Sequence, residues 1–522
     1  MTSNTAAGDA RLDARRDLST LARGWLLNLG GVLSTGLFGF VFGIVVSRGL
    51  GASGAGVFFS AVALFTIASA AAQFGASTGL IRSIARFRAL GQHEVIAPTL
   101  AAALLPITAL SVLLAAALFV FAGEFADLVL DGEAAETAER YLLVFAPFLP
   151  LAVASTALLG ATRGLGTMIP FVAIEQLGKA LLRPVLALAV LAAGLGSVAF
   201  AFAWAIPHAL GFAAAFVALI LLIRHGEGSR PAYRPTGEAA SDFWRFAAPR
   251  GVSGIFQITL FWLDTILVAA LASPHDAGIY KGAISYITQG TFANQAVVFV
   301  IGPLLSALLA QELHERARSV YQTATWWLTA LAWPVYLTLA VFAPLCMSVF
   351  GPEFVSGATA LVILAIPMLL AMAAGPVNVV LLMAGKSVWN LLNVVLALIT
   401  NVALNVLLIP AFGITGAAVA WAATIVVWNV AALLEVRLFL NLQPLGSAFP
   451  LVALMAVGCY GAIGLALRLW LGANLPAFLL FALLATSLYA LLLWRFRDAL
   501  QVSILVESVR NRRRKVADAE LA

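Results

Sequence analysis

Charged residues are scarce in this sequence. They make up 10% of its 522 residues, whereas 62% of the residues are hydrophobic and the mean hydropathy is +1.01. No soluble protein could bury that much apolar surface, so the composition indicates a polytopic membrane protein. The net charge of +6 gives no reason to expect a nucleic-acid partner, because membrane proteins usually carry their excess of Lys and Arg in cytoplasmic loops.

Cysteine and histidine are rare as well. Cys346 and Cys459 both lie in apolar runs, and the five histidines are scattered, so we expect neither a disulfide framework nor a metal site. Lys386 and Ser387 look like the end of a phosphate-binding loop, but Val380 stands where its first glycine belongs. We therefore expect no cofactor, no ATP-hydrolysing domain and no enzymatic activity.

Apolar runs of roughly 20 residues predict an all-α membrane protein with about 14 transmembrane helices. A polar stretch rich in Gly, Pro and charge marks a linker between two six-helix halves. The predicted parts are a cytoplasmic N-terminal tail (1–22), an N-lobe of helices 1–6 (23–223), the cytoplasmic linker (224–242), a C-lobe of helices 7–12 (243–440), helices 13–14 (441–494) and a basic cytoplasmic tail (495–522).

The distribution of Lys and Arg predicts the orientation. They concentrate at the ends that carry the termini and the linker, whereas the loop 123–139 on the other side is acidic. Positive residues favour the cytoplasmic side, so both termini are expected in the cytoplasm. No cleavable signal precedes the first span, which we expect to insert and remain.

One predicted span carries polar residues at an unusual spacing. The apolar run Phe243–Tyr280 contains Arg250, Gln257 and Asp264, each seven residues apart. Seven residues is close to two helical turns, so the three share one face over about 21 Å. Charges at membrane depth normally face a bundle interior or a watery cavity. We predict that they line a cavity, with a buried network that only fixes packing as the alternative.

The two halves repeat each other. Shifting the second half back by 222 positions matches its polar positions with polar positions of the first, although Asp264 meets Phe42. The matched pairs are Arg245 with Arg23, Arg250 with Asn28, Gln257 with Thr35, Asn401 with Lys179, and Asn405 with Arg183. A duplicated bundle with a site between its halves is how many transporters are built, so Asn28, Asn401 and Asn405 join the candidate cavity residues.

The fifth predicted span is also unusually polar. Glu175, Lys179 and Arg183 lie at positions i, i+4 and i+8, on one side of a helix. Glu four residues before Lys favours an intrahelical pair, which leaves Arg183 as the unbalanced cation. A cavity role is the functional interpretation, and polar contacts that join helices are the alternative. His208, beside Pro207 in the sixth span, is a candidate coupling group because its charge changes near neutral pH; a structural role is the alternative.

Three stretches carry a family resemblance. They are Arg23–Phe58, the run from Phe246 to Tyr280 with Pro249 and Asp264, and Leu404–Ala422, LNVLLIPAFGITGAAVAWA. With these stretches the chain resembles the polysaccharide-exporter branch of the MOP superfamily, the Wzx-type flippases of lipid-linked oligosaccharides. These are relatives of the MATE exporters and of the lipid II flippase.

The resemblance implies two pseudo-symmetric six-helix lobes around a central cavity that alternates between inward-open and outward-open states, with two C-terminal helices appended. It implies transport of an undecaprenyl-diphosphate-linked glycan from the inner to the outer leaflet of a bacterial plasma membrane. Polysaccharide polymerase and glycosyltransferase partners are expected by analogy. The leading alternative is a MATE-like cation- or proton-coupled multidrug exporter; a membrane-embedded glycan enzyme and a non-transporting scaffold are further rivals.

A diphosphate requires cations, and Lys179, Arg183 and Arg250 offer them at membrane depth. In this interpretation Asp264 keeps the cavity from being uniformly cationic or, like His208, couples transport to an ion. Three further arginines are expected to attract head groups at the mouths of the cavity: Arg23, Arg48 and Arg245.

Overall fold

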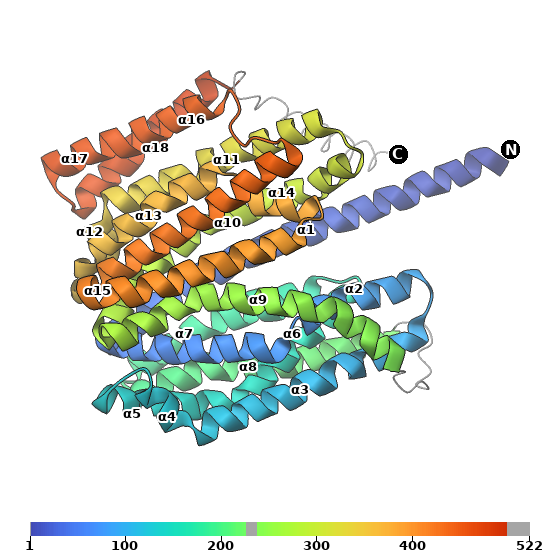
Figure 1. Ribbon diagram of the computed structural model, residues 1–522, viewed down its shortest axis with the longest axis horizontal. Helices are drawn as coiled ribbons and strands as arrows, with labels where there is room; N and C mark the ends of the chain where they lie inside the picture. Colours follow the sequence, from blue (N-terminus) through green and yellow to red (C-terminus); the bar gives the residue numbers. More distant parts are fainter. Residues whose placement is uncertain (1, 226–236, 498–522) are drawn as a thin grey trace. The chain divides into compact units, whose positions relative to one another are not determined.

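The computed structural model describes residues 2–225 and 237–497 (Figure 1). All regular elements in these two ranges are helices, which confirms the predicted all-α class. The first half contains α1 (Thr2–Gln73), α2 (Ala76–Ala89), α3 (Ile96–Val120), α4 (Ala122–Asp127), α5 (Gly132–Phe145), α6 (Leu149–Gly164), the π-helix η3 (Phe171–Gly178), α7 (Lys179–Ala192) and α8 (Ser197–His225), with short 3₁₀ turns η1 (His93–Val95) and η2 (Ala146–Phe148).

The second half has the same character. It contains α9 (Gly237–Leu271), α10 (Pro274–Ala310), α11 (His314–Val341), α12 (Ala343–Ser348), α13 (Ala358–Ala373), α14 (Val377–Met383), α15 (Ser387–Leu440), α16 (Phe449–Ala456), the π-helix η5 (Val457–Ala462), α17 (Ile463–Leu471) and α18 (Leu475–Arg495), with a 3₁₀ turn η4 (Pro352–Gly357).

Ten helices in the described ranges are long and apolar enough to cross a membrane. Two of these helical stretches contain a glycine in the left-handed region, Gly51 (φ 69°) in α1 and Gly413 (φ 55°) in α15. Because such a residue interrupts a helix, each of the two stretches consists of two helical segments. The predicted count of 14 spans stays a prediction.

The chain forms two compact units. One consists of Met1–Phe292, Met347–Ala360 and Leu391–Trp428, and the other of the remaining segments between Ala293 and Ala522. The first unit thus continues past the predicted linker into α9 and α10. Residues 226–236 of that linker, and the tail from 498 onwards, lie outside the described residues.

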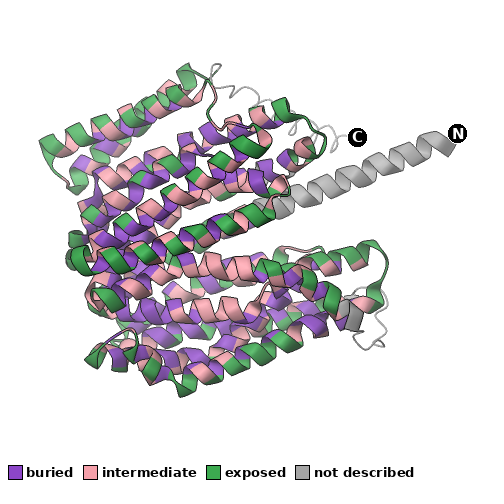
Figure 2. Ribbon diagram, viewed as in Figure 1, coloured by how far each residue is buried: buried purple, intermediate pink, exposed green. Residues whose placement is uncertain are grey.

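Each unit has its own apolar core. In the first unit the buried side chains of α2, α3 and α6 pack with Phe243 and Ala247 of α9. In the second unit an aromatic cluster gathers Phe342, Tyr460 and Phe481. Large apolar side chains also remain exposed along the helices, where buried and exposed positions alternate (Figure 2). An apolar outer surface is what a lipid-facing protein requires, and the multi-pass membrane architecture is consistent with it.

Two equivalent glycines show the repeat within the first unit. A Cβ at Gly56 of α1 would come within 1.8 Å of the Pro274 carbonyl oxygen, and one at Gly278 of α10 within 2.0 Å of the Ala52 carbonyl oxygen. Gly56 and Gly278 are 222 positions apart, and so are Ala52 and Pro274. The two contacts are therefore equivalent: Gly56 meets the carbonyl of Pro274, and Gly278 meets the carbonyl of Ala52, the residue that corresponds to Pro274 in the first half. Such reciprocal contact is expected where a pseudo-twofold axis relates duplicated helices.

Candidate functional site

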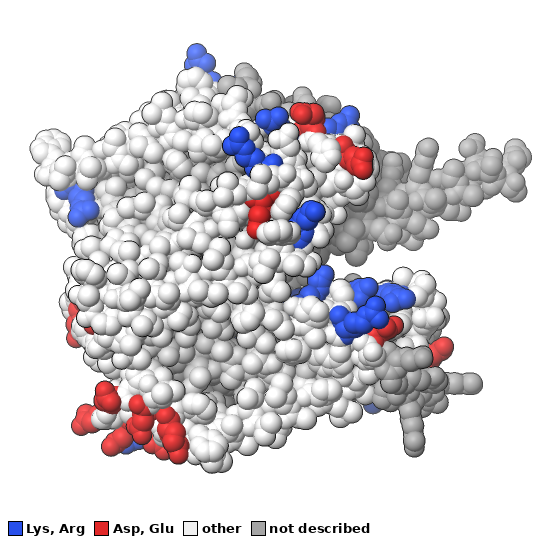
Figure 3. Space-filling model, viewed as in Figure 1, with Lys and Arg blue, Asp and Glu red and all other residues white. Residues whose placement is uncertain are grey.

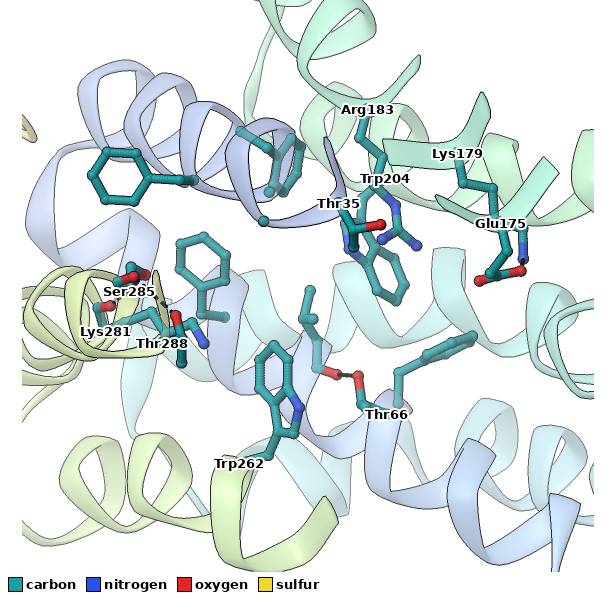
Figure 4. A pocket seen from close by; sticks show the side chains of 18 of the residues that line it. Thr35, Thr66, Glu175, Lys179, Arg183, Trp204, Trp262, Lys281, Ser285 and Thr288 are labelled. Carbon is teal, nitrogen blue, oxygen red and sulfur yellow. Dashed lines mark hydrogen bonds and ion pairs between the residues drawn. The ribbon is translucent and has the colours of Figure 1, made fainter. Parts of the chain in front are cut away.

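A cavity of about 480 Å³ lies within the first unit (Figure 4). Residues of α1, α6, the η3–α7 helix, α8, α9 and α10 line it. On α10 the lining residues are Lys281, Ser285, Thr288, Gln289 and Phe292, whose spacing places them on one helical face. An apolar bundle thus encloses polar groups at a position where they are costly unless they serve a function.

One wall carries an ion pair. Lys179 Nζ lies 2.7 Å from Glu175 Oε2, one helical turn away. The Lys179 side chain is 4% exposed and that of Glu175 is 30% exposed. The carboxylate therefore satisfies the buried ammonium group, as the spacing predicted, and both residues line the cavity.

Arg183 lies on the same wall with His208 of α8. Its Nη2 is 2.9 Å from His208 Nε2, and its guanidinium carbon is 4.7 Å from the centre of the Trp204 ring. Because a guanidinium can only donate, Nε2 accepts this hydrogen bond and the imidazole is neutral in this arrangement. Arg183 has no carboxylate within ion-pair range among the described residues, so it supplies a positive charge to the cavity.

Lys281 of α10 provides a further cation. In Figure 4 it lies with Ser285 and Thr288 on the wall opposite Glu175, Lys179 and Arg183. Its Nζ is 3.9 Å from the centre of the Trp262 ring and 5.6 Å from that of Phe59. In the part of the chain that the structure describes, no acidic group pairs with Lys281. The two aromatic rings stabilise its ammonium group instead.

The π-helix η3 sets the position of the charged wall. Gln176 donates from Nε2 to Asn28 Oδ1 at 3.1 Å, and Thr35 Oγ1 donates to the Gln176 carbonyl oxygen at 3.1 Å. The predicted residue Asn28 therefore holds α1 against η3 and is not among the cavity-lining residues, whereas Thr35 lines the cavity.

A second polar network lies in the later half of the chain. Asp264 accepts from Tyr280 Oη at 3.0 Å and from Asn405 Nδ2 at 2.8 Å, and Asn405 Nδ2 also donates to Asn401 Oδ1 at 3.1 Å. All four side chains are buried. The structure thus brings three predicted site residues together, but they do not line the cavity.

The other predicted residues lie elsewhere. Arg250 is exposed, with its guanidinium carbon 4.3 Å from the centre of the Phe246 ring, and Gln257 is half-buried; neither lines the cavity. Arg48 is exposed and donates from Nε to the Val349 carbonyl oxygen at 2.9 Å. Arg245 is exposed, and the side chain of Arg23 lies outside the described residues.

Sequence reasoning missed Lys281 and the aromatic lining. Lys281 directly follows the family-like stretch that ends at Tyr280, and no sequence pattern singled it out as a cavity residue. The available signal was a lysine inside a long apolar helix, which is costly and therefore a candidate functional group. Trp204 and Trp262 gave no such signal, because tryptophan is common in membrane helices at interfaces. Within the described residues no cluster of His, Cys, Asp and Glu suits a metal ion.

Comparisons with known proteins support this picture. Residues 21–308 match the family described as polysaccharide biosynthesis protein. A curated relative, the probable low-salt glycan biosynthesis flippase Agl15 of Haloferax volcanii, is 27% identical over 205 residues, which cover 38% of this chain and 42% of the relative. The match therefore spans less than half of that protein.

Two solved structures show the fold. The lipid II flippase MurJ in an inward closed conformation aligns with a TM-score of 0.69 and 11% identity, over 91% of this chain and 99% of that one. An inward-facing MATE family multidrug transporter of the MOP superfamily aligns with a TM-score of 0.64 and 17% identity, over 78% and 94%. With more than half of its residues matched by the family and this fold, the chain belongs to the polysaccharide biosynthesis protein family of membrane proteins.

Proposed function

We propose that this protein flips an undecaprenyl-diphosphate-linked oligosaccharide from the inner to the outer leaflet of the bacterial plasma membrane by alternating access. Such a substrate is an O-antigen, exopolysaccharide or capsule repeat unit. The observation that carries the proposal is the charge of the cavity lining, which combines Lys179, Arg183 and Lys281 with the single carboxylate Glu175. The family and the relative named as a glycan flippase point in the same direction.

The charges in the cavity lining are only partly paired. Glu175 neutralises Lys179 at 2.7 Å, while Arg183 and Lys281 keep their charges without a carboxylate partner in the described residues. Unpaired cations in a site walled by apolar helices interact strongly with an anion, since little water screens them. A guanidinium offers a planar fork to phosphate oxygens and an ammonium offers a point charge, so Arg183 and Lys281 together suit a diphosphate.

The aromatic lining suits the sugars. Trp204 and Trp262 stand in the same cavity as the cations. Its volume of about 480 Å³ lies within the usual range of ligand pockets, roughly 300–1,000 Å³. We therefore place the diphosphate and the nearest sugars in the cavity, with the prenyl chain outside among the lipids.

Charge at the two ends of the first unit supports the proposed orientation. Acidic side chains gather over α4 and α5, and basic ones over the ends of α2 and α9 (Figure 3). Positive ends favour the cytoplasm, and the proposal has both termini on that side. Glycosyltransferases that complete the lipid-linked glycan would then deliver it on that side, and a polymerase would receive it on the other.

A MATE-like multidrug exporter is the alternative, and the buried carboxylate Asp264 favours it, because such a group suits coupling to a cation. The excess of cations in the lining disfavours it, since a cationic drug would be repelled. A glycan flippase binds an anionic substrate, whereas a drug exporter of this kind binds a cation. If the proposed function holds, Lys281→Gln should weaken transport of the anionic substrate.

The test is the leaflet distribution of lipid-linked glycan in spheroplasts depleted of the protein, measured with a membrane-impermeant lectin. We expect the glycan to accumulate on the cytoplasmic face and the wild type to restore outer display. Lys281→Gln should restore it about tenfold less well, since hydrogen bonds to charged groups contribute roughly 1.5–3 kcal/mol. The matched control is Lys386→Gln, which removes a lysine that also lies over a ring, 5.2 Å from Phe439, and is not among the cavity-lining residues. Normal outer display without the protein would refute the proposal.

A further inference from the structure

Helices α2 and α9 pack unusually closely. A Cβ at Gly75, which has φ 78°, would lie 2.3 Å from the Ala247 carbonyl oxygen, and a Cβ at Gly251 would lie 2.4 Å from the carbonyl carbon of Phe74. A Cβ at Gly79 would lie 2.8 Å from the Phe243 ring. Gly75 and Gly251 thus allow direct backbone contact, and Gly79 leaves room for the Phe243 ring, so the neighbouring side chains of the two helices lie close together.

The close packing brings two arginines to one aromatic ring. The guanidinium carbon of Arg82 in α2 lies 4.0 Å from the centre of the Phe246 ring, and that of Arg250 in α9 lies 4.3 Å from the same centre. Both arginines are exposed and Phe246 is half-buried between them. Each cation is attracted to the ring, which holds the pair together despite the repulsion between like charges.

Neither arginine has an acidic partner. Among the side chains that the structure describes, no carboxylate lies within ion-pair range of Arg82 or Arg250, although Asp242 stands on α9 and Glu94 follows α2 closely in the chain. Basic side chains gather over this part of α2 and α9 (Figure 3). Two guanidinium groups on one ring, with no described carboxylate within ion-pair range, form a site that an anion would complete.

We propose that Arg82 and Arg250 form a clamp that binds the phosphate of a lipid head group at the membrane surface. A guanidinium that stacks on a ring keeps its N–H edge free, and two such edges match the oxygens of a phosphate or diphosphate. The ligand comes from a bulk phospholipid or from a prenyl diphosphate, which share this chemistry. The clamp is separate from the cavity, whose lining includes neither arginine, and it does not depend on the proposed transport function.

The clamp gives Arg250 a different role from the one its spacing suggested. Although Arg250, Gln257 and Asp264 share one face of α9, Arg250 is exposed while Asp264 is buried. A charge at the exposed end of the face meets the head-group region, where basic side chains attract anionic lipid. In this arrangement Arg250 binds a head group outside the cavity.

The experiment is lipid binding to the full-length protein in nanodiscs of phosphatidylcholine, titrated with phosphatidylglycerol in one arm and undecaprenyl diphosphate in the other. We expect Arg82→Gln and Arg250→Gln each to weaken binding of at least one lipid about tenfold. Arg86→Gln is the matched control, because it removes an exposed arginine from the same helix that has no ring contact; it should change binding less than twofold. Phe246→Leu should weaken binding by an intermediate factor.

The two arms identify the source of the phosphate. Loss confined to phosphatidylglycerol assigns the clamp to bulk lipid, and loss confined to undecaprenyl diphosphate assigns it to prenyl-linked glycans; either result supports the clamp. Binding by Arg82→Gln and Arg250→Gln within twofold of the wild type in both arms would overturn it. An equal loss in Arg86→Gln would also overturn it, because general surface charge would then explain the effect. Both arginines are exposed, so the variants should fold, and size-exclusion profiles check this.

Discussion

The two halves of this chain share a frame but differ in the polar groups that they place on it. Phe42 and Phe58 of the first half lie with their ring centres 6.0 Å apart. Their counterparts 222 positions later are Asp264 and Tyr280, which share a hydrogen bond of 3.0 Å. The same two helical positions therefore meet in both halves, once as an aromatic contact and once as a polar one.

At two other pairs of equivalent positions, the first half carries the charged side chains and the second half the neutral ones. Lys179 and Arg183 of the first half bring charge to the cavity, whereas their counterparts Asn401 and Asn405 are neutral and buried away from it. The duplicated backbone thus constrains which positions touch, and side-chain chemistry decides which half offers charge to a ligand. Four sets of variants test this difference between the halves, from the largest expected effect to the smallest.

The strongest test of the shared backbone arrangement is the close helix contact at Gly56 and Gly278. Gly56→Ala and Gly278→Ala should each destabilise the protein by about 3 kcal/mol, because both new methyl groups meet backbone carbonyls and overpacking of this kind costs roughly 1–3 kcal/mol or more. Thermal unfolding in detergent followed by tryptophan fluorescence measures the effect. Gly254→Ala is the control, since a Cβ there meets nothing within 4 Å. A large difference in destabilisation between Gly56→Ala and Gly278→Ala would show that the two positions are not structurally equivalent.

Asp264→Leu tests the buried network. The change leaves the Tyr280 hydroxyl and an Asn405 amide without their acceptor, and each unsatisfied buried group costs roughly 1–3 kcal/mol, so we expect about 2–3 kcal/mol of destabilisation. Phe42→Leu at the equivalent position should cost only about 1 kcal/mol, as a modest loss of packing. Chemical unfolding of both variants compares them. Equal costs would mean that the polar network adds nothing to the packing.

Arg183→Gln tests whether transport needs the charge at this position, where the second half has the neutral Asn405. Glycan export should fall about tenfold with little loss of fold, because one charge-assisted contact to the anionic substrate disappears. Arg163→Gln is the control: that guanidinium also stacks on a ring, 4.1 Å from Phe171, but does not line the cavity. Export by Arg183→Gln at the wild-type rate would show that Arg183 makes no contact that transport requires.

The smallest effect on export is expected from Glu175→Gln. The Gln amide oxygen can still accept from Lys179, but the buried ammonium group loses its counter-charge, so unfolding should shift by about 1–2 kcal/mol. Export should change less than about threefold, because Lys179 becomes a further free cation and no substrate contact is lost. The leaflet assay measures it. A loss as large as that of Arg183→Gln would show that the ion pair itself is required.

Much of the fold could be predicted from the sequence, because long apolar stretches and their breaks are local properties. The spacing of Glu175, Lys179 and Arg183 also predicted one polar wall, since an i, i+4 pattern fixes neighbours within a helix. The seven-residue spacing of Arg250, Gln257 and Asp264 could not show whether their shared helix face lines a cavity or lies on the surface. Periodicity shows which residues share a face but not what that face contacts.

Contacts between distant segments could not be predicted. Lys281 reaches the cavity only because α10 faces η3 and α7 across it, and Asp264 meets Asn405 across 141 positions of sequence. The clamp of Arg82 and Arg250 depends on glycines that bring α2 and α9 together. Each of these requires the packing of helices, which no pattern within one helix contains.

The most direct measurement is transport by the purified protein in proteoliposomes, with lipid-linked oligosaccharide and a cationic dye offered in parallel. We expect translocation of the glycan, abolished in the double variant Arg183→Gln with Lys281→Gln, and no transport of the dye. Transport of the dye without the glycan, unaffected by the double variant, would contradict the proposed function and identify a drug exporter.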